Sequence, residues 1–353
     1  MRATKYLVIA AAIGFTIAGC GSGDKSDTGT TTGTTSTSGT TAATTSTGGG
    51  GTSASDITIA VIPKGSTHDY WKHVKMGADQ AASELGVKVD FEGPEKEDDK
   101  QSQINMVENM ISKKVKGIVL APLDNKALVK PIEEAAAANI PVVIIDSGVD
   151  TKKILAMVST DNYKGGQVDA DELIRLLNGK GNIAVLRYEK GSASTDAREK
   201  GFEDEIKAKA PNIKIVSDTT EAGATRDSAQ RAAENMLAAF RKPDGSLGLD
   251  GIFCPNESST FGMMKVLEEN KWAGKVKFVG FDAAPELVDG LNKGEIDALV
   301  VQNPVKMGHD GVKVLVDYIK NGTKPQDEDT GATLVTKAKL SDPEIAKLVA
   351  PAQ

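Results

Sequence analysis

The chain has 353 residues, of which 39% are hydrophobic and 26% charged, and its formal net charge is −7. This length allows two domains with a core each, and the acidic balance argues against binding nucleic acid or an anionic membrane through bulk charge. Only two cysteines occur, Cys20 and Cys254, and because Cys20 is assigned below to a lipid anchor, a disulfide scaffold is excluded.

Residues 1–19 have the pattern of a secretory signal peptide. Arg2 and Lys5 precede an apolar run over residues 6–18 that is too short for a permanent membrane span, and small residues lead into Cys20. This end resembles the lipobox of bacterial lipoproteins, which implies cleavage before Cys20 and acylation of its thiol. The alternative is an ordinary cleaved signal beside a chance cysteine.

Residues 20–55 are expected to form a disordered tether. Of residues 21–55, 29 of 35 are Gly, Ser or Thr, and none is aromatic or a long aliphatic residue. Because such side chains cannot offset the entropy lost on ordering, we expect the folded body to begin near residue 56.

From residue 57, short β-branched apolar runs alternate with longer amphipathic segments, which is typical of βαβ units. The first set predicts strands at 57–62, 87–91, 117–120 and 142–145, with helices at 69–85, 100–114 and 124–138. Continuous apolar strands favour a parallel sheet covered on both faces. Pro131 lies inside the third helix and predicts a kink or a later start.

A second set follows after residue 161. It predicts strands at 182–187, 213–217, 250–253, 276–281 and 297–301, with helices at 164–178, 195–209, 225–240 and 258–271. The sequence therefore predicts an α/β protein with two doubly wound lobes.

Doubly wound sheets bind ligands at the carboxyl ends of their strands, and the loops expected there hold carboxylates, amides, Arg and aromatic residues. None of these loops carries a dinucleotide, Walker, nucleophile-elbow or zinc-protease motif, so we expect neither an enzyme nor a cofactor. His68 and His73 are not spaced as paired metal ligands, so we expect no metal site. Cys254 ends an apolar strand and is expected to be a small buried hydrophobe.

Several short motifs occur in the order known from one family. They are the Ile59–Ile62 run followed by Tyr70-Trp71, the apolar strand ending at Asp146, Arg198-Glu199-Lys200-Gly201-Phe202, Pro255-Asn256-Glu257, Gly280-Phe281-Asp282 and Gln302. Over residues 56–340 the chain resembles periplasmic sugar-binding proteins of the ribose-binding class, the type I periplasmic binding proteins that serve ABC importers.

The resemblance implies two Rossmann-like lobes joined by a three-crossing hinge near residues 161, 302–303 and 328–333. The N-terminal lobe would hold residues 56–161 and about 303–330, and the C-terminal lobe residues 162–302 and about 331–353. A monomer of this kind would trap a sugar between its lobes and deliver it to membrane permease subunits. It would act outside the cytoplasm, in the periplasm or at the cell surface.

The resemblance also implies a site. The expected ligand-binding residues are Lys64, His68, Tyr70, Trp71, Asp146, Asp196, Arg198, Asn256, Asp282 and Gln302. Carboxylates accept hydrogen bonds from sugar hydroxyls, Arg and amides donate to them, and aromatic faces cover the C–H side of the ring. The alternatives are that Asp146 and Asp282 are helix N-caps, that Gln302 is a hinge surface residue and that the aromatic pair is simple core.

Departures from the family pattern leave the ligand open. Ser147 stands where ribose binders have Arg, and the family's next sugar-binding Arg aligns nearer Asp196 than Arg198. With Lys64 and Asp196, the chain resembles receptors for a furanosyl quorum signal at those two positions, although Ala197 stands where those receptors have Gln. We therefore expect a pentose, hexose or polyol first and that signal second, with a sensory role toward a chemoreceptor or kinase also open. A lacI-type regulator would need a helix-turn-helix where the signal peptide stands, and a surface-tethered enzyme is a further alternative.

Overall fold

Two sheets organise residues 57–352, the part of the chain that the computed structural model describes. The predicted signal peptide, the tether and Cys20 lie outside these residues. The first sheet contains β1 (Thr58–Ile62), β2 (Lys88–Phe91), β3 (Gly117–Leu120), β4 (Val142–Ile145), β5 (Ala156–Ser159) and β11 (Glu328–Asp329). The second contains β6 (Lys180–Val185), β7 (Asn212–Ser217), β8 (Gly251–Phe253), β9 (Lys277–Phe281), β10 (Ala298–Gln302) and β12 (Ala332–Thr336).

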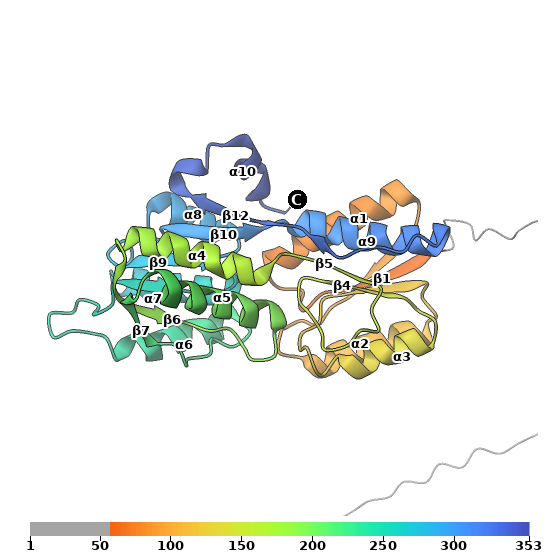
Figure 1. Cartoon of the computed structure of the whole chain (residues 1–353), viewed down its shortest axis with the longest axis horizontal. Coiled ribbons are helices and arrows are strands. Elements are labelled where there is room, and N and C mark those ends of the chain that lie inside the picture. Colours follow the sequence, from red (N-terminus) through yellow and green to blue (C-terminus); the bar gives the residue numbers. More distant parts are fainter. Residues whose placement is uncertain (1–56, 353) are drawn as a thin grey trace, which may run out of the picture. The chain divides into compact units, whose positions relative to one another are not determined.

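The two sheets have corresponding strand orders. Figure 1 shows β1, β4 and β5 in one sheet and β6, β7, β9 and β10 in the other, each beside its own helices. The first runs β11-β5-β4-β3-β1-β2 and the second β12-β10-β9-β8-β6-β7, so β4 and β9 occupy equivalent places. All neighbouring strands in them are parallel except β10 and β12, which are antiparallel. This arrangement confirms the predicted fold class of two doubly wound α/β lobes.

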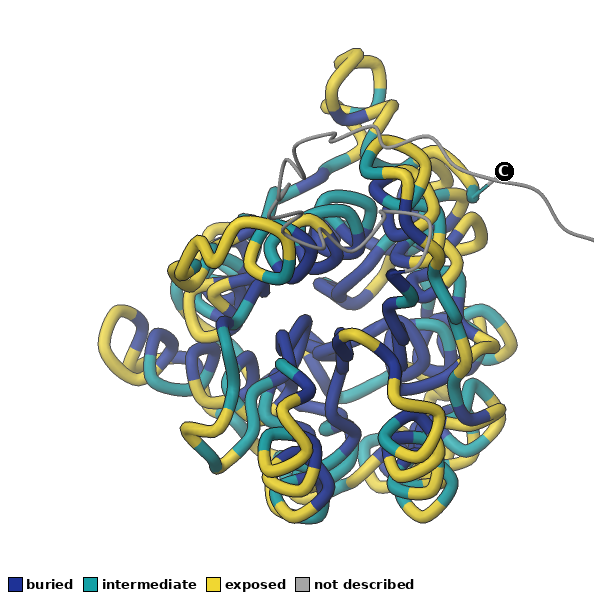
Figure 2. The backbone as a smooth tube through the Cα atoms, turned by 90° about the vertical axis from the view of Figure 1, so that its right-hand side faces the viewer, coloured by how far each residue is buried: buried dark blue, intermediate teal, exposed yellow. Residues whose placement is uncertain are grey.

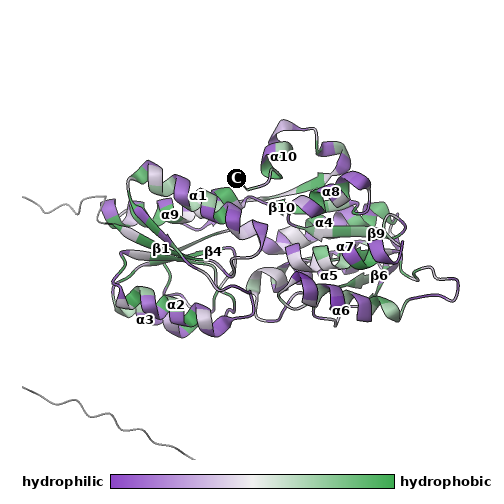
Figure 3. Cartoon of the chain, turned by 180° about the vertical axis from the view of Figure 1, so that it is seen from behind, coloured by the Kyte–Doolittle hydropathy of each residue, from purple (hydrophilic) through white to green (hydrophobic). Residues whose placement is uncertain are grey.

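Each sheet is covered by helices on both faces, which explains why its strands are continuous apolar runs. On β1, Ile59 and Val61 pack with α1 (Asp69–Leu85) and α9 (Pro304–Asn321), whereas Ala60 and Ile62 pack with α2 (Lys100–Ser112) and α3 (Val129–Ala137). We call this sheet with its four helices the first lobe. Figure 2 shows buried residues toward the inside and exposed ones outside, and Figure 3 shows the hydrophobic strands between the helices.

The second sheet is covered in the same way. On β6, Ile183 and Val185 pack with α4 (Asn162–Leu176) and α5 (Ala193–Lys209). Ala184 of β6, and Leu186 directly after the strand, belong to the core with α6 (Arg226–Ala238), α7 (Glu257–Glu269) and α8 (Pro285–Lys293). The short η2 (Lys337–Lys339) and α10 (Pro343–Leu348) follow β12, and Ile345 of α10 joins that core. We call this assembly the second lobe.

The chain passes between the lobes at three places, after β5, after β10 and between β11 and β12. Pro131 lies in the first turn of α3, which begins at Val129, so the prediction of a later helix start is confirmed. The sequence did not predict β5, β11, β12, α8, α9, η2 or α10. No helix among residues 57–352 combines the length and apolarity that a membrane crossing requires.

Glycines allow two helix pairs to approach closely. A Cβ atom at Gly77 of α1 would lie 1.9 Å from the carbonyl oxygen of Val305 on α9. A Cβ atom at Gly166 of α4 would lie 1.9 Å from the carbonyl oxygen of Arg198 on α5. Both contacts involve backbone that cannot turn away, so each glycine fixes the distance between two helices of its lobe.

Candidate functional site

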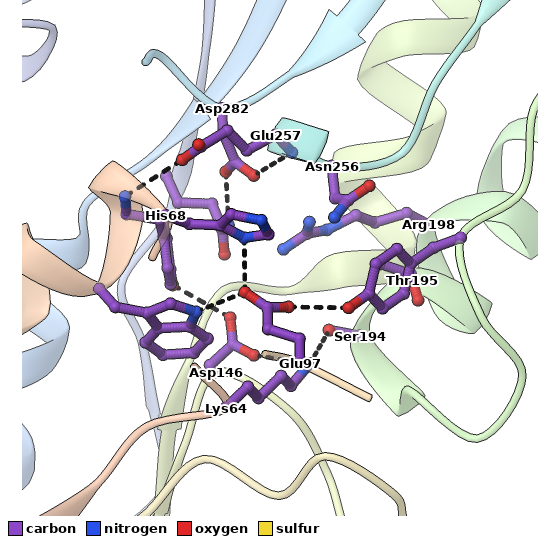
Figure 4. A pocket seen from close by; sticks show the side chains of 14 residues that line it. Lys64, His68, Glu97, Asp146, Ser194, Thr195, Arg198, Asn256, Glu257 and Asp282 are labelled. Atoms are coloured by element: carbon purple, nitrogen blue, oxygen red, sulfur yellow. Dashed lines mark hydrogen bonds and ion pairs between the residues drawn. The ribbon is translucent and has the colours of Figure 1, made fainter. Parts of the chain in front are cut away.

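A pocket lies where the carboxyl ends of both sets of strands meet, and both lobes contribute to it (Figure 4). It contains about 330 Å³ not filled by protein atoms, open solvent included. Its lining residues are Lys64, His68, Tyr70, Trp71, Glu97, Asp146, Tyr188, Ser194, Thr195, Arg198, Asn256, Glu257, Asp282 and Gln302. The location follows the rule for doubly wound sheets.

Asp146 and Asp282 occupy the same position in the two lobes. Asp146 directly follows β4 and Asp282 directly follows β9, and both adopt a left-handed backbone, with φ of 62° and 71°. Asp tolerates this conformation better than most residues, and strained backbone of this kind is common at binding sites. Neither residue is the N-cap of the next helix, so the N-cap interpretation of them is wrong.

Lys64 links the first lobe to the second. Its Nζ lies 3.0 Å from Asp146 Oδ2 and donates hydrogen bonds to Oγ of Ser192 and of Ser194, at 3.1 and 3.0 Å. The hydroxyl of Tyr70 donates to Asp146 Oδ1 at 3.0 Å. Asp146 is therefore held by a cation and a phenol.

Glu97 is the centre of a second buried cluster. It accepts hydrogen bonds from the indole N–H of Trp71 at 2.6 Å and from the hydroxyl of Tyr188 at 2.8 Å, and it pairs with His68 Nδ1 at 2.5 Å. Burial alone would lower the pKa of His68, but the charge of Glu97 and the hydrogen bond to it raise that pKa to about 9. Burial would likewise raise the pKa of Glu97, but His68, with Lys64 and Trp71, lowers it to about 2. The pair is ionised at neutral pH.

Arg198 reaches the pocket from α5 in a fixed orientation. Its Nε donates to Asn162 Oδ1 at 2.8 Å, its Nη1 donates to the carbonyl oxygen of Pro255 at 3.0 Å, and its guanidinium carbon lies 3.8 Å from the ring centre of Phe281. Its Nη2 is buried and has no hydrogen-bond partner among residues 57–352. A donor is thus held ready for a ligand.

Asp282 has protein partners on both oxygens. Oδ2 accepts from the backbone N–H of Glu257 at 3.0 Å, and Oδ1 accepts from Gln302 Nε2 at 2.9 Å. Burial raises the pKa of Asp282 to about 6, and the charge of Arg198 offsets part of that effect. The Oε1 of Gln302 is buried without a partner in the described part of the chain. It offers a ligand a free acceptor.

The pocket charges compensate one another. Lys64 pairs with Asp146, His68 with Glu97, and Arg226 pairs with Glu257 at 2.8 Å. Arg198 and Asp282 interact through charge. Because an additional charge in so buried a place would be left uncompensated, the site favours an uncharged ligand with several hydroxyl groups.

Nine of the ten residues predicted from the sequence line this pocket, and Asp196 does not. Asp196 is exposed on the first turn of α5. Successive helix residues point about 100° apart, so a helix that turns Ser194 and Arg198 toward the pocket turns Asp196 away. Asp196 therefore does not line the pocket that the other nine residues share.

The sequence did not single out five lining residues, Glu97, Tyr188, Ser194, Thr195 and Glu257. Glu97 lies in the loop after β2, within a run of charged residues that is typical of a solvated surface. Ligands bind at the carboxyl ends of strands in doubly wound sheets, and applying this rule to β2 as well would have marked the loop that holds Glu97. The remaining four lie in loops or helix starts that the rule already marked.

No group of His, Cys, Asp and Glu residues suited to a metal ion occurs within residues 57–352. Cys254 is fully buried at the end of β8, and burial raises the pKa of its thiol well above the usual value. This position agrees with the expectation of a small buried hydrophobe rather than a nucleophile.

Comparison with known proteins gives one family. Residues 59–324 match the model of the periplasmic binding protein domain. The D-allose-binding periplasmic protein of Escherichia coli is 33% identical over 271 residues, which cover 74% of this chain and 85% of that protein.

Two solved structures are also similar. A carbohydrate transporter solute binding protein from Agrobacterium radiobacter, in complex with D-arabinose, is 37% identical with a TM-score of 0.78, over 83% of this chain and 98% of that one. An ABC transporter solute binding protein from Agrobacterium vitis with bound D-fucose is 34% identical with a TM-score of 0.77, over 83% and 99%.

Proposed function

The chain belongs to the periplasmic binding protein family, and from this premise we propose that it is a receptor that binds a neutral monosaccharide or polyol between its lobes and delivers it to an ABC importer. The family and its relatives are binding proteins, which agrees with the expectation that the chain is not an enzyme. Family membership also implies a location outside the cytoplasm.

The observation that carries this proposal is the balance of positive and negative charges around the pocket, beside buried hydrogen-bonding atoms that have no partner among the described residues. Arg198 Nη2 offers a donor and Gln302 Oε1 an acceptor, both buried. Sugar hydroxyls both donate and accept, so they match a mixed set of this kind. A charged substrate would lack a counterion.

The pocket also suits the apolar side of a sugar ring. Tyr70 and Trp71 lie edge to face, with ring centres 4.8 Å apart, and both line the pocket. Their hydrogen bonds to Asp146 and Glu97 fix the two rings without consuming their faces. We propose that these rings clamp the ligand while Asp146, Asp282, Arg198 and Asn256 bind its hydroxyls.

The ligand is of monosaccharide size. The relatives named above bind D-allose, D-arabinose and D-fucose, so these sugars are the first candidates. The furanosyl quorum signal is less well supported, because Asp196, one of the residues that suggested it, does not line the pocket.

A thermal-shift screen tests the proposal. The panel holds D-allose, D-arabinose, D-fucose, a polyol, the furanosyl signal and D-gluconate as a charged control. A sugar at 100 times its Kd should add about 2.7 kcal/mol to the free energy of unfolding. Stabilisation by gluconate alone, or by no neutral compound, would contradict the proposal.

We further propose that the mature chain is a monomer anchored through a lipid on Cys20, which is supported by the small residues before that cysteine and the Gly/Ser/Thr-rich segment after it. Intact-mass measurement of membrane-extracted protein should find a chain that begins at an acylated Cys20. Cys20→Ser should release the protein from membranes. A chain that begins elsewhere, or an unmodified thiol, would exclude the anchor.

A further inference from the structure

Helix α1 of the first lobe begins without a cap of its own. Its N-cap residue, His68, makes no capping hydrogen bond through its side chain, which is engaged with Glu97 instead. The first backbone N–H groups of a helix have no acceptor within the helix and need one from elsewhere. One of them, the N–H of Tyr70, donates to Glu257 Oε2 at 3.2 Å. The acceptor belongs to α7 of the second lobe.

Glu257 is fixed by its own lobe. It is buried, with 2% of its surface exposed. Its other oxygen, Oε1, accepts from Arg226 Nη2 at 2.8 Å, and Arg226 also binds Glu286 at 2.9 Å. Its backbone N–H donates to Asp282 Oδ2. Both carboxylate oxygens therefore have protein partners, although the residue lines the pocket.

We propose that Glu257 is a positioning residue for lobe closure, which caps the N-terminus of α1 from the opposite lobe. This inference rests on the proposed function, in which the lobes close on a sugar. A negative charge at a helix N-terminus is favourable, and α1 carries the aromatic pair Tyr70 and Trp71 in its first turn. Closure thus completes the helix that holds the aromatic clamp, and opening leaves its first turn without this acceptor.

Two variants separate this role from a general contribution to stability. Glu257→Gln keeps the shape and an acceptor oxygen but removes the charge. Glu286→Gln is the matched control, because Glu286 binds the same Arg226 but does not line the pocket. The measurements are ligand Kd and dissociation rate, the Tm of ligand-free and ligand-saturated protein, and hydrogen exchange at the Tyr70 amide.

Glu257→Gln should weaken binding about 3- to 30-fold, as expected for loss of a helix cap, mainly through faster dissociation. In ligand-saturated protein, exchange at the Tyr70 amide should become faster. The Tm of ligand-free protein should stay at the wild-type value, and Glu286→Gln should change none of these quantities. An unchanged Kd and dissociation rate would overturn the proposal. So would an equal loss of Tm with and without ligand, because Glu257 would then serve its own lobe only.

The two proposals fail in different ways. If wild-type protein binds no sugar in the screen, the proposed function fails, and the cap across the lobes, which rests on it, fails with it. If wild-type protein binds a sugar but Glu257→Gln binds it with the wild-type Kd and dissociation rate, only the cap across the lobes fails.

Discussion

Asp146 and Asp282 give equivalent carboxylates from opposite lobes, so each should contribute to affinity. Both residues have a left-handed backbone, which Asn tolerates better than Ala. Asp→Asn therefore tests the carboxylate with less backbone strain than Asp→Ala. Each variant replaces a charge-assisted hydrogen bond by a neutral one, which should cost about 1–3 kcal/mol and weaken Kd roughly 5- to 150-fold. Fluorescence titration measures this loss. His309→Gln, outside the pocket, is the control, and wild-type affinity in both Asn variants would mean that the site is misplaced.

Affinity should also depend on pH through Asp282, whose pKa burial raises to about 6. The ionised carboxylate accepts hydrogen bonds, so protonation should weaken binding as the pH falls below about 6. Kd of wild type at pH 5 and pH 7.5 measures this effect, and Asp282→Asn should show a smaller change. A wild-type Kd that is the same at both values would show that this carboxylate does not bind the ligand as an anion.

The pair of His68 and Glu97 makes stability depend on pH. The folded pKa of His68 is about 9, above its ordinary 6.5, so its stabilising contribution is complete below pH 6.5 and is lost as the pH rises through 9. The shift corresponds to about 3 kcal/mol at most. Urea unfolding at pH 6.5 and pH 9 should show this loss in wild type and little of it in the double variant His68→Gln, Glu97→Gln. If the free energy of unfolding fell equally between pH 6.5 and pH 9 in both proteins, the pair of His68 and Glu97 would be excluded as the cause of this loss.

At the scale of elements, the packing of α4 on α5 depends on Gly166. A Cβ atom there would force the backbone of Arg198 away, so Gly166→Ala should lower the free energy of unfolding by about 1–3 kcal/mol and also weaken ligand binding. Gly148→Ala is the control, because its Cβ would lie 3.7 Å from the nearest atom outside its chain neighbours. Urea unfolding measures the loss, and wild-type stability of Gly166→Ala would show that the helices have room to separate.

Most strands were predictable from the sequence because they are buried on both faces and therefore apolar throughout, as in residues 142–145. The positions of Asp146 and Asp282 followed from the ends of such strands. Glu97 was missed because the loop after β2 was not included among the strand ends, and its run of charged residues gives no sign of which carboxylate is buried. Motif alignment placed Asp196 with the site residues because it does not take into account which side of the helix a residue lies on, and Asp196 does not line the pocket. The capping of α1 by Glu257 depends on contact between lobes, which no local pattern contains.

At the scale of the whole molecule, the lobes are joined by three chain crossings and meet over a polar pocket. Hydrogen bonds join them, such as those of Lys64 with Ser192 and Ser194, and each hydrophobic core cluster of the described residues belongs to one lobe. Water can replace such contacts more readily than an apolar core, so a hinge motion between rigid lobes is favoured. Small-angle scattering should report a smaller radius of gyration at saturating sugar than without it. An unchanged radius would argue against closure.

The central claim is that one neutral sugar binds between the lobes through Asp146 and Asp282. Calorimetric titration of wild type and of the double variant Asp146→Asn, Asp282→Asn, with the sugar that stabilises wild type most, tests it most directly. We expect one site per wild-type chain and no measurable heat of binding in a double variant that is still folded. Wild-type affinity in the double variant, or the absence of a one-site isotherm in wild type, would contradict the claim.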